Sequence, residues 1–379
     1  RGSAARGRRG RPNSVVREPS WLDQQSVAAI EGRPTGGADA APSQAELDAP
    51  PEIDGSEFIK PGDVPDNLEH WLPDEASAPA DVPNILHFVA DNGPDPTPVA
   101  VEWPYFQYLH VQSAVTTHSP DKVYVYYRAQ PYGEWWDKTL KLKGVQRIRL
   151  DNRLYTGFYG HPVTGPHMSD KIRLMVLLKH GGVYFDNDVL SIRNIQPLLS
   201  QSSMGGSCAF MGDETSKDFP KFSNAVIGAI PNCKFLRLWW QNYTDFDDKN
   251  WIEHSMARPV ALHREHPGLL QLLPQLTFEP YGPQTWKPPA SQSLFAVGAN
   301  VTEVDLAGLQ GLPGMGDDAN TGDRFWVGRI PRRHAEPTYA LHLFGHINLG
   351  ALMALNETTR CHEDTLFNHM TRLSVPCPP

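Results

Sequence analysis

The sequence predicts an α/β fold with a mainly parallel central sheet. Two observations predict it: three β-rich apolar runs at residues 83–89, 122–128 and 145–150, and a helical pattern of spaced apolar residues at 105–118 between the first two. A strand, a helix and a second strand at short spacing form a βαβ unit, whose two strands are parallel because the helix carries the chain back to the same end of the sheet. No internal repeat is visible.

The first 80 residues have a different composition. Residues 1–14 are basic and rich in glycine, and residues 34–55 are acidic, small and rich in proline. Neither stretch has enough apolar surface to offset the loss of chain entropy on folding. We therefore predict a flexible, disordered stem over residues 1–80, with one docked turn around Trp71 and Leu72, and a single folded domain over 81–379.

Composition limits the class of protein. The chain has 379 residues, of which 40% are hydrophobic and 20% charged, which suits a folded domain with a sizeable core. The net charge of −9 argues against nucleic-acid binding by a broad basic surface. No apolar run approaches the roughly 20 residues that span a bilayer. Because the chain begins with Arg1, we expect that an N-terminal piece is missing and that any membrane anchor lay there.

The cysteines and glycosylation sequons favour an oxidising compartment. The chain has four cysteines, Cys208, Cys233, Cys361 and Cys377. They form no C-x-x-C pair, which argues against a zinc site, and they permit three connectivities, one of which joins sequence neighbours in two local bridges. Asn242, Asn300 and Asn356 each begin an Asn-x-Thr sequon. With the even cysteine count, the sequons favour the secretory pathway.

The segment "SDKIRLMVLLKHGGVYFDNDV", residues 169–189, predicts a buried helix followed by a buried strand. Ser169 is a good N-cap, with Asp170 in the first turn, and Gly181 is placed to end the helix. The strand then ends in two aspartates. Side chains alternate along a strand, so Asp186 and Asp188 are expected on the same side.

Two carboxylates on one side of a strand end repel each other unless a cation lies between them. Mn²⁺ and Mg²⁺ bind carboxylate, phosphate and water oxygens, and such an ion stabilises the charge that develops on a departing diphosphate. The pair Asp186 and Asp188 therefore favours a metal site, with a surface turn as the alternative. A second Asp-x-Asp, at Asp245 and Asp247, lies in a polar stretch and is expected to be a solvated loop.

The segment resembles the sugar-binding region of the DXD glycosyltransferases of family 32, which include lactosylceramide α-1,4-galactosyltransferases and fungal initiating α-1,6-mannosyltransferases. The family pattern is Ser-Asp-x-x-Arg, an apolar helix, and Gly-Gly-(Ile/Val)-Tyr-(Leu/Phe)-Asp-x-Asp, and every fixed position is present at matching spacing. Weaker similarity extends to "PNILHFV" (83–89), "FSNAVIGAIPNCKFLRLWW" (222–240) and "YALHLFGHINLG" (339–350).

This resemblance implies a GT-A, Rossmann-like fold that binds a nucleotide sugar, with residues 81–379 as the catalytic domain. It implies a metal-dependent, retaining hexosyltransferase that uses Mn²⁺ or Mg²⁺. The donor would be a UDP-sugar, with GDP-mannose as the less favoured option, and the acceptor a glycan, glycolipid or protein hydroxyl. A type II membrane glycoprotein of the Golgi lumen is implied, with secretion as the alternative.

The resemblance also assigns a metal shell. Asp188 would bind the metal, and Asp186 would support it while holding ribose or sugar hydroxyls; together they are the catalytic carboxylates. His342 would complete the shell, although the default for a histidine in an apolar stretch is a hydrogen-bonded core residue. His346, four residues later, leaves open which of the two histidines contacts the metal.

The resemblance assigns a second group of residues to binding of the nucleotide-sugar donor. Asp170 and Arg173 would bind the donor sugar, His87 and Phe88 of the opening strand would contact the nucleotide, and Asn224 would line the pocket. Without the resemblance, Asp170 would be a helix-start anion paired with Arg173, and Asn224 would cap a strand end. Spacing alone shows no ligand pattern for His87, His161, His167 or His180, and favours a surface position for them.

Mechanism and specificity are less determined. No carboxylate can be named as a covalent nucleophile, so we expect a front-face substitution, with double displacement as the alternative. Galactosyltransferase-like relatives carry a Gly-Pro-x-Leu-Leu-Thr run after a tryptophan, whereas "IEHSMARPVAL" follows Trp251 here, which leaves donor and acceptor specificity open. The alternative function is a non-catalytic nucleotide- or glycan-binding domain. A metal-dependent phosphohydrolase ranks last, because it would need further clusters of acidic or histidine ligands.

Overall fold

The structure is a computed structural model. It describes residues 52–54, 72–73, 79–90, 99–151, 159, 161, 163, 166–215, 220–250, 252–280, 294–295, 297 and 338–378. All described elements belong to one compact unit, Asp48–Pro379. Most of the predicted stem, together with Trp71, Trp251 and Asn300, lies outside the described residues.

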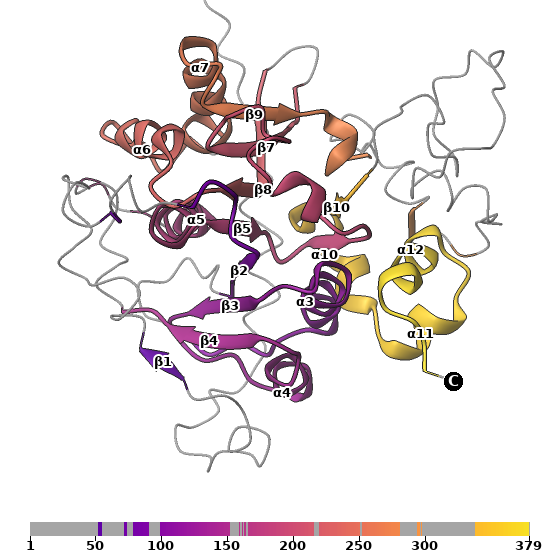
Figure 1. Ribbon diagram of the computed structural model, residues 1–379. Coiled ribbons are helices and arrows are strands. Elements are labelled where there is room, and N and C mark those ends of the chain that lie inside the picture. Colours follow the sequence, from indigo (N-terminus) through magenta and orange to yellow (C-terminus); the bar gives the residue numbers. More distant parts are fainter. Residues whose placement is uncertain are drawn as a thin grey trace, which may run out of the picture. The chain divides into compact units, whose positions relative to one another are not determined.

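An eight-stranded sheet runs through the described part of the chain, in the order β1-β4-β3-β2-β5-β8-β7-β9 (Figure 1). Its strands are β1 (Ile53–Asp54), β2 (Ile85–Val89), β3 (Lys122–Tyr127), β4 (Val145–Arg149), β5 (Gly182–Phe185), β7 (Ala209–Asp213), β8 (Phe222–Ala229) and β9 (Leu270–Leu273). Every neighbouring pair is parallel except the two pairs that include β8. The predicted α/β fold with a mainly parallel sheet is confirmed.

The first half of the sheet follows the predicted βαβ pattern. β2, β3 and β4 lie within the three predicted runs, and α3 (Tyr105–His118) spans the predicted helix. α4 (Glu134–Leu140) links β3 to β4. The chain thus moves outward from β2 to β4, and then α5 (Pro166–His180) carries it back to the other side of β2, where β5 pairs with β2. Such reversal points are where open α/β sheets bind ligands, at the carboxyl ends of the strands.

The start of α5 differs from the prediction. The helix begins at Pro166, so Ser169 is an interior residue rather than the N-cap, and Asp170 does not lie in the first turn. Proline is favoured in a first helical turn. Nδ1 of His167 lies 3.0 Å from a carboxylate oxygen of Asp248, and this contact anchors the helical turn that precedes Ser169. The predicted end is confirmed, because Gly181 has a φ of +63° and its N–H donates to the carbonyl of Leu177.

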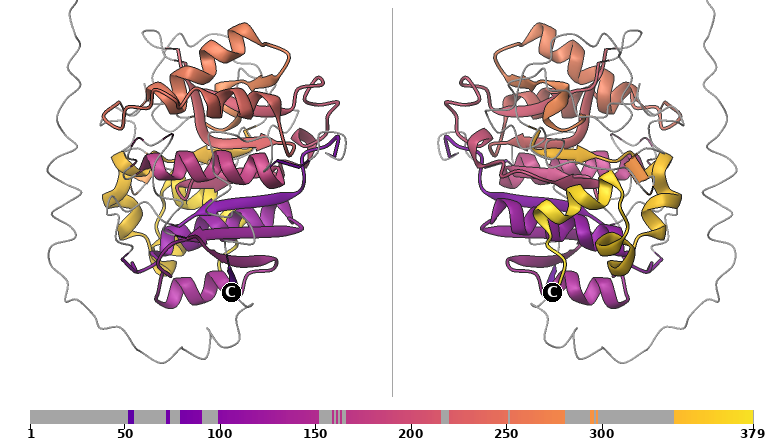
Figure 2. Two further views of the ribbon diagram at one scale, coloured as in Figure 1. Left: turned by 90° about the vertical axis from the view of Figure 1, so that its left-hand side faces the viewer. Right: turned by 90° about the vertical axis from the view of Figure 1, so that its right-hand side faces the viewer.

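Helices cover both faces of the sheet, as the two turned views show (Figure 2). One core cluster joins Phe88 and Phe185 of the sheet to α3, α4, α10 (Gly345–Ala354) and α12 (Leu366–Ser374). The other joins Tyr126 and Tyr184 to α5, α6 (Lys234–Gln241) and α7 (Arg258–Glu265). Because both faces of the sheet are covered, the central strands β2, β3 and β5 are almost wholly buried, and they read as nearly continuous apolar runs.

The C-terminal segment returns to the centre of the molecule. β10 (Ala340–His342) pairs antiparallel with β6 (Val189–Ser191) in a small second sheet. α11 (Glu357–His362) follows α10, and a disulfide joins Cys361 to Cys377. The second disulfide joins Cys208 to Cys233, so both bridges are the local ones. The remaining short helices are η5 (Gln196–Leu198), η6 (Glu253–Ala257) and η7 (Gln275–Thr277).

Part of the predicted stem lies in the sheet. β1 pairs with β4, and the Glu52 carboxylate accepts a hydrogen bond from the Tyr127 hydroxyl at 2.6 Å and forms a 3.1 Å ion pair with Arg149. The domain boundary at residue 81 stays a prediction. Among the residues that the structure describes, no helix combines the length and the apolar character needed to cross a bilayer.

Candidate metal centre

The two aspartates lie in the turn between β5 and β6. β5 ends at Phe185 and β6 begins at Val189, and the turn closes with the N–H of Val189 donating to the carbonyl of Asp186 at 3.2 Å. The Asn187 side chain anchors the turn to the carboxyl end of β2, since its amide donates to the carbonyl of Val89. The turn therefore lies at the point where the strand order reverses, the position that binds ligands in related architectures.

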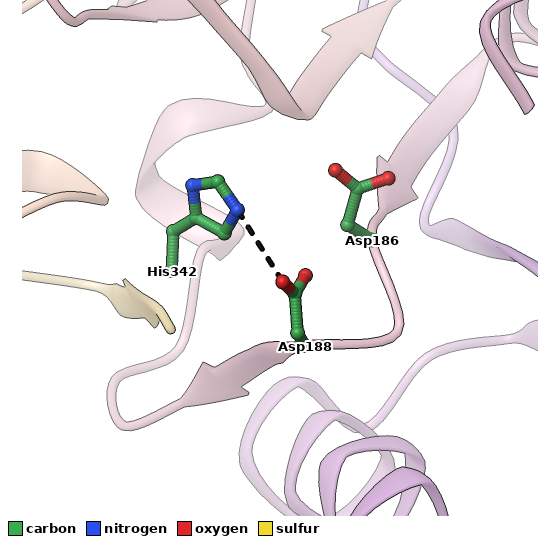
Figure 3. A group of neighbouring side chains, drawn as sticks. All are labelled: Asp186, Asp188 and His342. Atoms are coloured by element: carbon green, nitrogen blue, oxygen red, sulfur yellow. Dashed lines mark ion pairs between the residues drawn. The ribbon is translucent and has the colours of Figure 1, made fainter. Parts of the chain in front are cut away.

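His342 joins the two aspartates through the second sheet. In the register of that sheet His342 lies opposite Val189, and the N–H of Leu343 donates to the Asp188 carbonyl at 2.9 Å. One ligand atom from each of Asp186, Asp188 and His342 lies within 4.8 Å of the others (Figure 3). The predicted same-side arrangement of the two aspartates is present, although a turn rather than a strand produces it.

Electrostatics tie His342 to Asp188. Nε2 of His342 lies 3.6 Å from Oδ2 of Asp188, an ion-pair distance rather than a hydrogen bond. The backbone N–H of Gly345 donates to the same carboxylate oxygen. Burial raises the pKa of Asp188, but the His342 charge and the Gly345 N–H outweigh burial, so the net pKa lies below its usual range. Burial likewise opposes protonation of His342, yet the Asp188 and Glu279 carboxylates hold its pKa well above 6.5.

Asp186 is held differently. Burial raises its pKa to about 6; repulsion from Asp188 adds to the rise, while the Arg173 guanidinium opposes it. The Tyr184 hydroxyl donates to Oδ1 of Asp186 at 2.6 Å. The two aspartates thus have opposite pKa shifts, because Asp188 has the imidazolium and a backbone donor while Asp186 is desolvated beside a second carboxylate.

The predicted donor-sugar residues meet around Arg173. Its Nη2 lies 3.1 Å from Oδ1 of Asp170 and 3.2 Å from Oδ1 of Asp186, and its guanidinium packs 4.5 Å from the centre of the Tyr184 ring. Asn224, from β8, donates to Oδ1 of Asp170 at 2.9 Å. Arg173, Asp170 and Asn224 therefore form one polar network that borders the metal-ligand candidates.

The Ser169 side chain belongs to the same network. Its hydroxyl accepts from Arg173 Nη2 at 2.9 Å, and its carbonyl accepts from Nε. The helical spacing of Ser169 and Arg173 places the two on one face of α5. The Ser in the family pattern therefore fixes the arginine here, rather than capping the helix.

Two other predicted site residues lie in the core. His87 is fully buried, its ring nitrogens lying 2.9 Å from the Tyr126 hydroxyl and 2.8 Å from the Gly181 carbonyl. Phe88 is also fully buried and stacks on Phe185. A contact between these side chains and a nucleotide would require them to leave the core. The expectation of a surface position is wrong for His87 and for His167, because both are buried with polar partners.

The structure distinguishes His342 from His346. His342 ends β10, whereas His346 lies in the first turn of α10 and is exposed, so the two do not share one helix.

The second Asp-x-Asp is as predicted: Asp245 and Asp247 are exposed, and Asp245 pairs with Arg258 at 2.9 Å.

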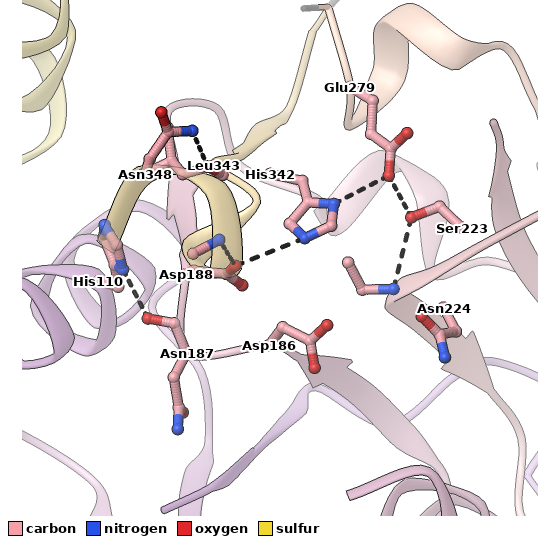
Figure 4. A network of polar contacts seen from close by, with 12 residues as sticks. His110, Asp186, Asn187, Asp188, Ser223, Asn224, Glu279, His342, Leu343 and Asn348 are labelled. Atoms are coloured by element: carbon pink, nitrogen blue, oxygen red, sulfur yellow. Dashed lines mark hydrogen bonds and ion pairs between the residues drawn. The ribbon is translucent and has the colours of Figure 1, made fainter. Parts of the chain in front are cut away.

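Sequence reasoning missed three residues of the site (Figure 4 shows two of them, Ser223 and Glu279). Tyr184 carried a usable signal, since strand alternation places it on the same side as Asp186. Ser223 and Glu279 lie behind His342: Glu279 Oε1 is 3.1 Å from His342 Nδ1 and accepts from the Ser223 hydroxyl. Nothing near residue 279 in the sequence pointed to this role.

The residues present fit a hard divalent cation. Two carboxylates and one imidazole converge, and their oxygen and nitrogen atoms suit Mn²⁺ or Mg²⁺ more than a soft metal. Both aspartates are largely buried, with 23% and 18% of their side-chain surface exposed, so their mutual repulsion is poorly screened by water. A cation bound between them would relieve that repulsion.

Part of the chain is similar to known proteins. Residues 107–204 match the family model described as the glycosyltransferase sugar-binding region containing the DXD motif. The chain is also 31% identical over 200 residues to Glucan organizing enzyme 1 of Cryptococcus neoformans var. grubii, covering 52% of this chain and 54% of that protein. The chain thus spans about half the length of this relative.

Solved structures give a weaker similarity. Galactosyltransferase LgtC, in complex with donor and acceptor sugar analogues, has a TM-score of 0.35 and 13% identity, over 78% of this chain and 96% of that one. The PaToxG glycosyltransferase has a TM-score of 0.34 and 18% identity, over 50% and 72%. The UDP-bound glycosyltransferase domain of the YGT toxin has a TM-score of 0.31 and 9% identity, over 52% and 80%.

Proposed function

We propose, from the match of residues 107–204 to the glycosyltransferase sugar-binding region containing the DXD motif, that the chain is a metal-dependent glycosyltransferase using a nucleotide-sugar donor. One observation carries the proposal. Asp186, Asp188 and His342, from segments far apart in sequence, converge within 4.8 Å beside the point where the strand order reverses.

Asp186, Asp188 and His342 would hold Mn²⁺ or Mg²⁺. When bound, such an ion neutralises the charge that develops on the departing nucleoside diphosphate. Gly345 supports this arrangement, since its N–H fixes the Asp188 carboxylate. Metal identity is part of the proposal, and Mn²⁺ is the ion we would test first.

The donor sugar would lie against the Arg173 network. Asp170 and Asp186 offer carboxylate oxygens for sugar or ribose hydroxyls, and the Arg173 guanidinium holds both carboxylates in place. Asn224 restricts Asp170 further by donating to the same oxygen. Substrate positioning of this kind lowers the barrier, because the reacting atoms are held in register before the reaction.

The finer features of the reaction are also proposals. We propose that the anomeric configuration is retained through a front-face substitution, that a UDP-sugar is the preferred donor, and that the acceptor offers a glycan, glycolipid or protein hydroxyl. Two disulfides support an oxidising compartment, which agrees with residence in the Golgi lumen. Proton NMR of the product's anomeric signal would distinguish retention from inversion.

Donor hydrolysis tests the proposed function. The full chain is incubated with a panel of UDP- and GDP-sugars and Mn²⁺, with and without EDTA, and the freed nucleotide is measured. We expect release from one donor, loss with EDTA, and loss in Asp188→Asn, while Asp245→Asn in the exposed second Asp-x-Asp retains activity. Metal-dependent nucleotide binding with no release, even with an acceptor panel, would instead support a non-catalytic binding domain.

A further inference from the structure

We propose that Glu279 is a positioning residue that orients His342 toward the metal, an inference that rests on the proposed function. The two ring nitrogens of His342 face two different carboxylates. Nδ1 lies 3.1 Å from Oε1 of Glu279, and Nε2 lies 3.6 Å from Oδ2 of Asp188 (Figure 4). The imidazole therefore bridges a buried acid on one side and the metal-ligand candidates on the other.

This arrangement selects one tautomer of the imidazole. A neutral imidazole carries one N–H, and the carboxylate at Nδ1 favours the proton there. The lone pair of Nε2 is then left on the side of Asp188 and Asp186. Carboxylates that accept from the remote nitrogen of a metal-binding histidine fix its orientation and raise its basicity in this way.

Glu279 is itself held in place. It is 1% exposed, and its Oε1 accepts a hydrogen bond from the Ser223 hydroxyl as well as lying next to His342. The backbone joins the same segments, since the N–H of His342 donates to the carbonyl of Phe278 at 2.9 Å. Both the side chain and the backbone next to Glu279 therefore fix the position of His342.

Two consecutive residues of β8, Ser223 and Asn224, support different parts of the site. Asn224 donates to Asp170 in the Arg173 network, and Ser223 donates to Glu279 behind the metal-ligand candidates. One strand thus supports both parts of the site through two consecutive residues, whose side chains project to opposite sides.

A second pair of a histidine and a carboxylate offers a comparison outside this network. Nε2 of His369 lies 2.7 Å from Oδ1 of Asp364. Within the described residues, His342 is the cationic side chain within ion-pair distance of Glu279. The Glu279 carboxylate therefore faces His342, and Asp364 offers a matched control, because it too lies beside a histidine.

Two readouts on the full chain test the inference. The first is Mn²⁺ affinity, measured by isothermal titration calorimetry and by the electron paramagnetic resonance of free Mn²⁺. We expect Glu279→Gln to weaken Mn²⁺ binding by about 10–100-fold, Ser223→Ala to weaken it less, and Asp364→Asn to leave it close to the wild-type value. Circular dichroism establishes that each variant is folded.

The second readout needs no metal, and it is taken at a pH above the raised pKa of His342, where the ring is neutral and carries a single N–H. Long-range ¹H–¹⁵N spectra of ¹⁵N-histidine protein, with His342→Ala to assign the signal, report which ring nitrogen of His342 carries the proton. We expect the Nδ1–H form in wild type and a mixture of tautomers in Glu279→Gln. An unchanged tautomer in Glu279→Gln overturns the inference, and so does unchanged Mn²⁺ affinity when His342→Ala loses it. Failure of donor hydrolysis alone, with both expected shifts present, counts against the proposed function and in favour of the positioning role.

Discussion

Arg173 and Asp186 form an ion pair whose arginine side chain is 4% exposed, with Nη2 of Arg173 3.2 Å from Oδ1 of Asp186. The same nitrogen lies 3.1 Å from Oδ1 of Asp170. One guanidinium thus compensates two carboxylates that are both needed at the proposed site. Arginine suits this position because its planar fork of donors stays charged when buried.

Removing that guanidinium should destabilise the fold. Arg173→Ala leaves the Asp170 and Asp186 carboxylates buried without a cation, and such a loss typically costs about 3–5 kcal/mol. We expect a urea unfolding midpoint well below that of wild type. Arg258→Ala is the matched control, since its partner Asp245 is exposed and its partner Glu253 is only half-buried, and ion pairs at the surface contribute at most about 1 kcal/mol. Equal losses in the two variants would contradict the role given to Arg173.

Gly345 should matter for metal binding because of its closeness to Asp188. A Cβ at Gly345 would lie 3.0 Å from Oδ2 and 3.3 Å from the Cβ of Asp188, so Gly345→Ala has to displace that carboxylate. We expect Mn²⁺ affinity to fall about tenfold or more, the lower end of the range for a disturbed ligand environment. Calorimetric titration measures it.

Gly350 in the same helix provides the control. A Cβ there meets no atom within 4 Å. Gly350→Ala should keep Mn²⁺ affinity and stabilise the protein by up to about 1 kcal/mol, through the higher helix propensity of alanine. A loss of affinity in this variant would mean that α10 as a whole, and not the contact with Asp188, decides metal binding.

His87 should make the stability of the protein pH-dependent. Burial, with a further contribution from His180, lowers the pKa of His87 to about 3, against 6.5 for the free group, although the Gly181 carbonyl opposes the shift. Below pH 6.5 the unfolded chain binds a proton at His87 that the folded protein does not bind. The contribution of neutral His87 to the free energy of unfolding is therefore complete above pH 6.5 and is lost as the pH falls toward about 3.

His87→Gln isolates that contribution. We expect the variant to be about 1–3 kcal/mol less stable at pH 7.5, because buried hydrogen bonds are disturbed. The difference from wild type should shrink by up to about 1.4 kcal/mol for each unit of pH below 6.5. Urea unfolding at several pH values measures both quantities, and a difference that stays constant with pH would contradict the assignment.

The C-terminal disulfide should contribute substantially to stability. Cys361 and Cys377 are 16 residues apart, and closing a loop of that size in the unfolded chain is worth about 3 kcal/mol. We expect the double variant Cys361→Ala/Cys377→Ala to lose about that amount in urea unfolding. Adding a reductant should then destabilise wild type more than the double variant, which retains the Cys208–Cys233 bridge.

Local patterns predicted the central elements well. α3 begins and ends at the predicted residues, and β2, β3 and β4 fall inside their predicted runs, because length, apolar content and β-branched residues agreed at each position. The Asp-x-Asp at 186–188 was separated from the decoy at 245–247 by the buried helix and strand before it. The structure bears out that contrast, since the decoy aspartates are exposed.

Non-local features were harder to predict. Ser169 has the residue type of an N-cap, but the contact between His167 and Asp248 extends α5 beyond it. Glu279 acts on a residue 63 positions away through a fold that brings η7 to β10, and no spacing rule connects them. His87 was assigned by similarity of its strand, whereas the sheet turns its side chain into the core. A motif such as the Asp-x-Asp can be recognised in the sequence. The distant residues that contact it are determined by the topology of the fold and cannot be read from spacing.

The pairing of β10 with β6 has a consequence for biosynthesis. His342 is encoded 342 − 188 = 154 residues after Asp188, which at ribosomal rates corresponds to roughly 8–30 s of translation. Throughout that interval the nascent chain presents the acidic pair with Arg173 but without the imidazole. The three candidate ligands are thus present together only after residue 342 has been made, and a chain that terminates before His342 would have the acidic turn and lack the histidine.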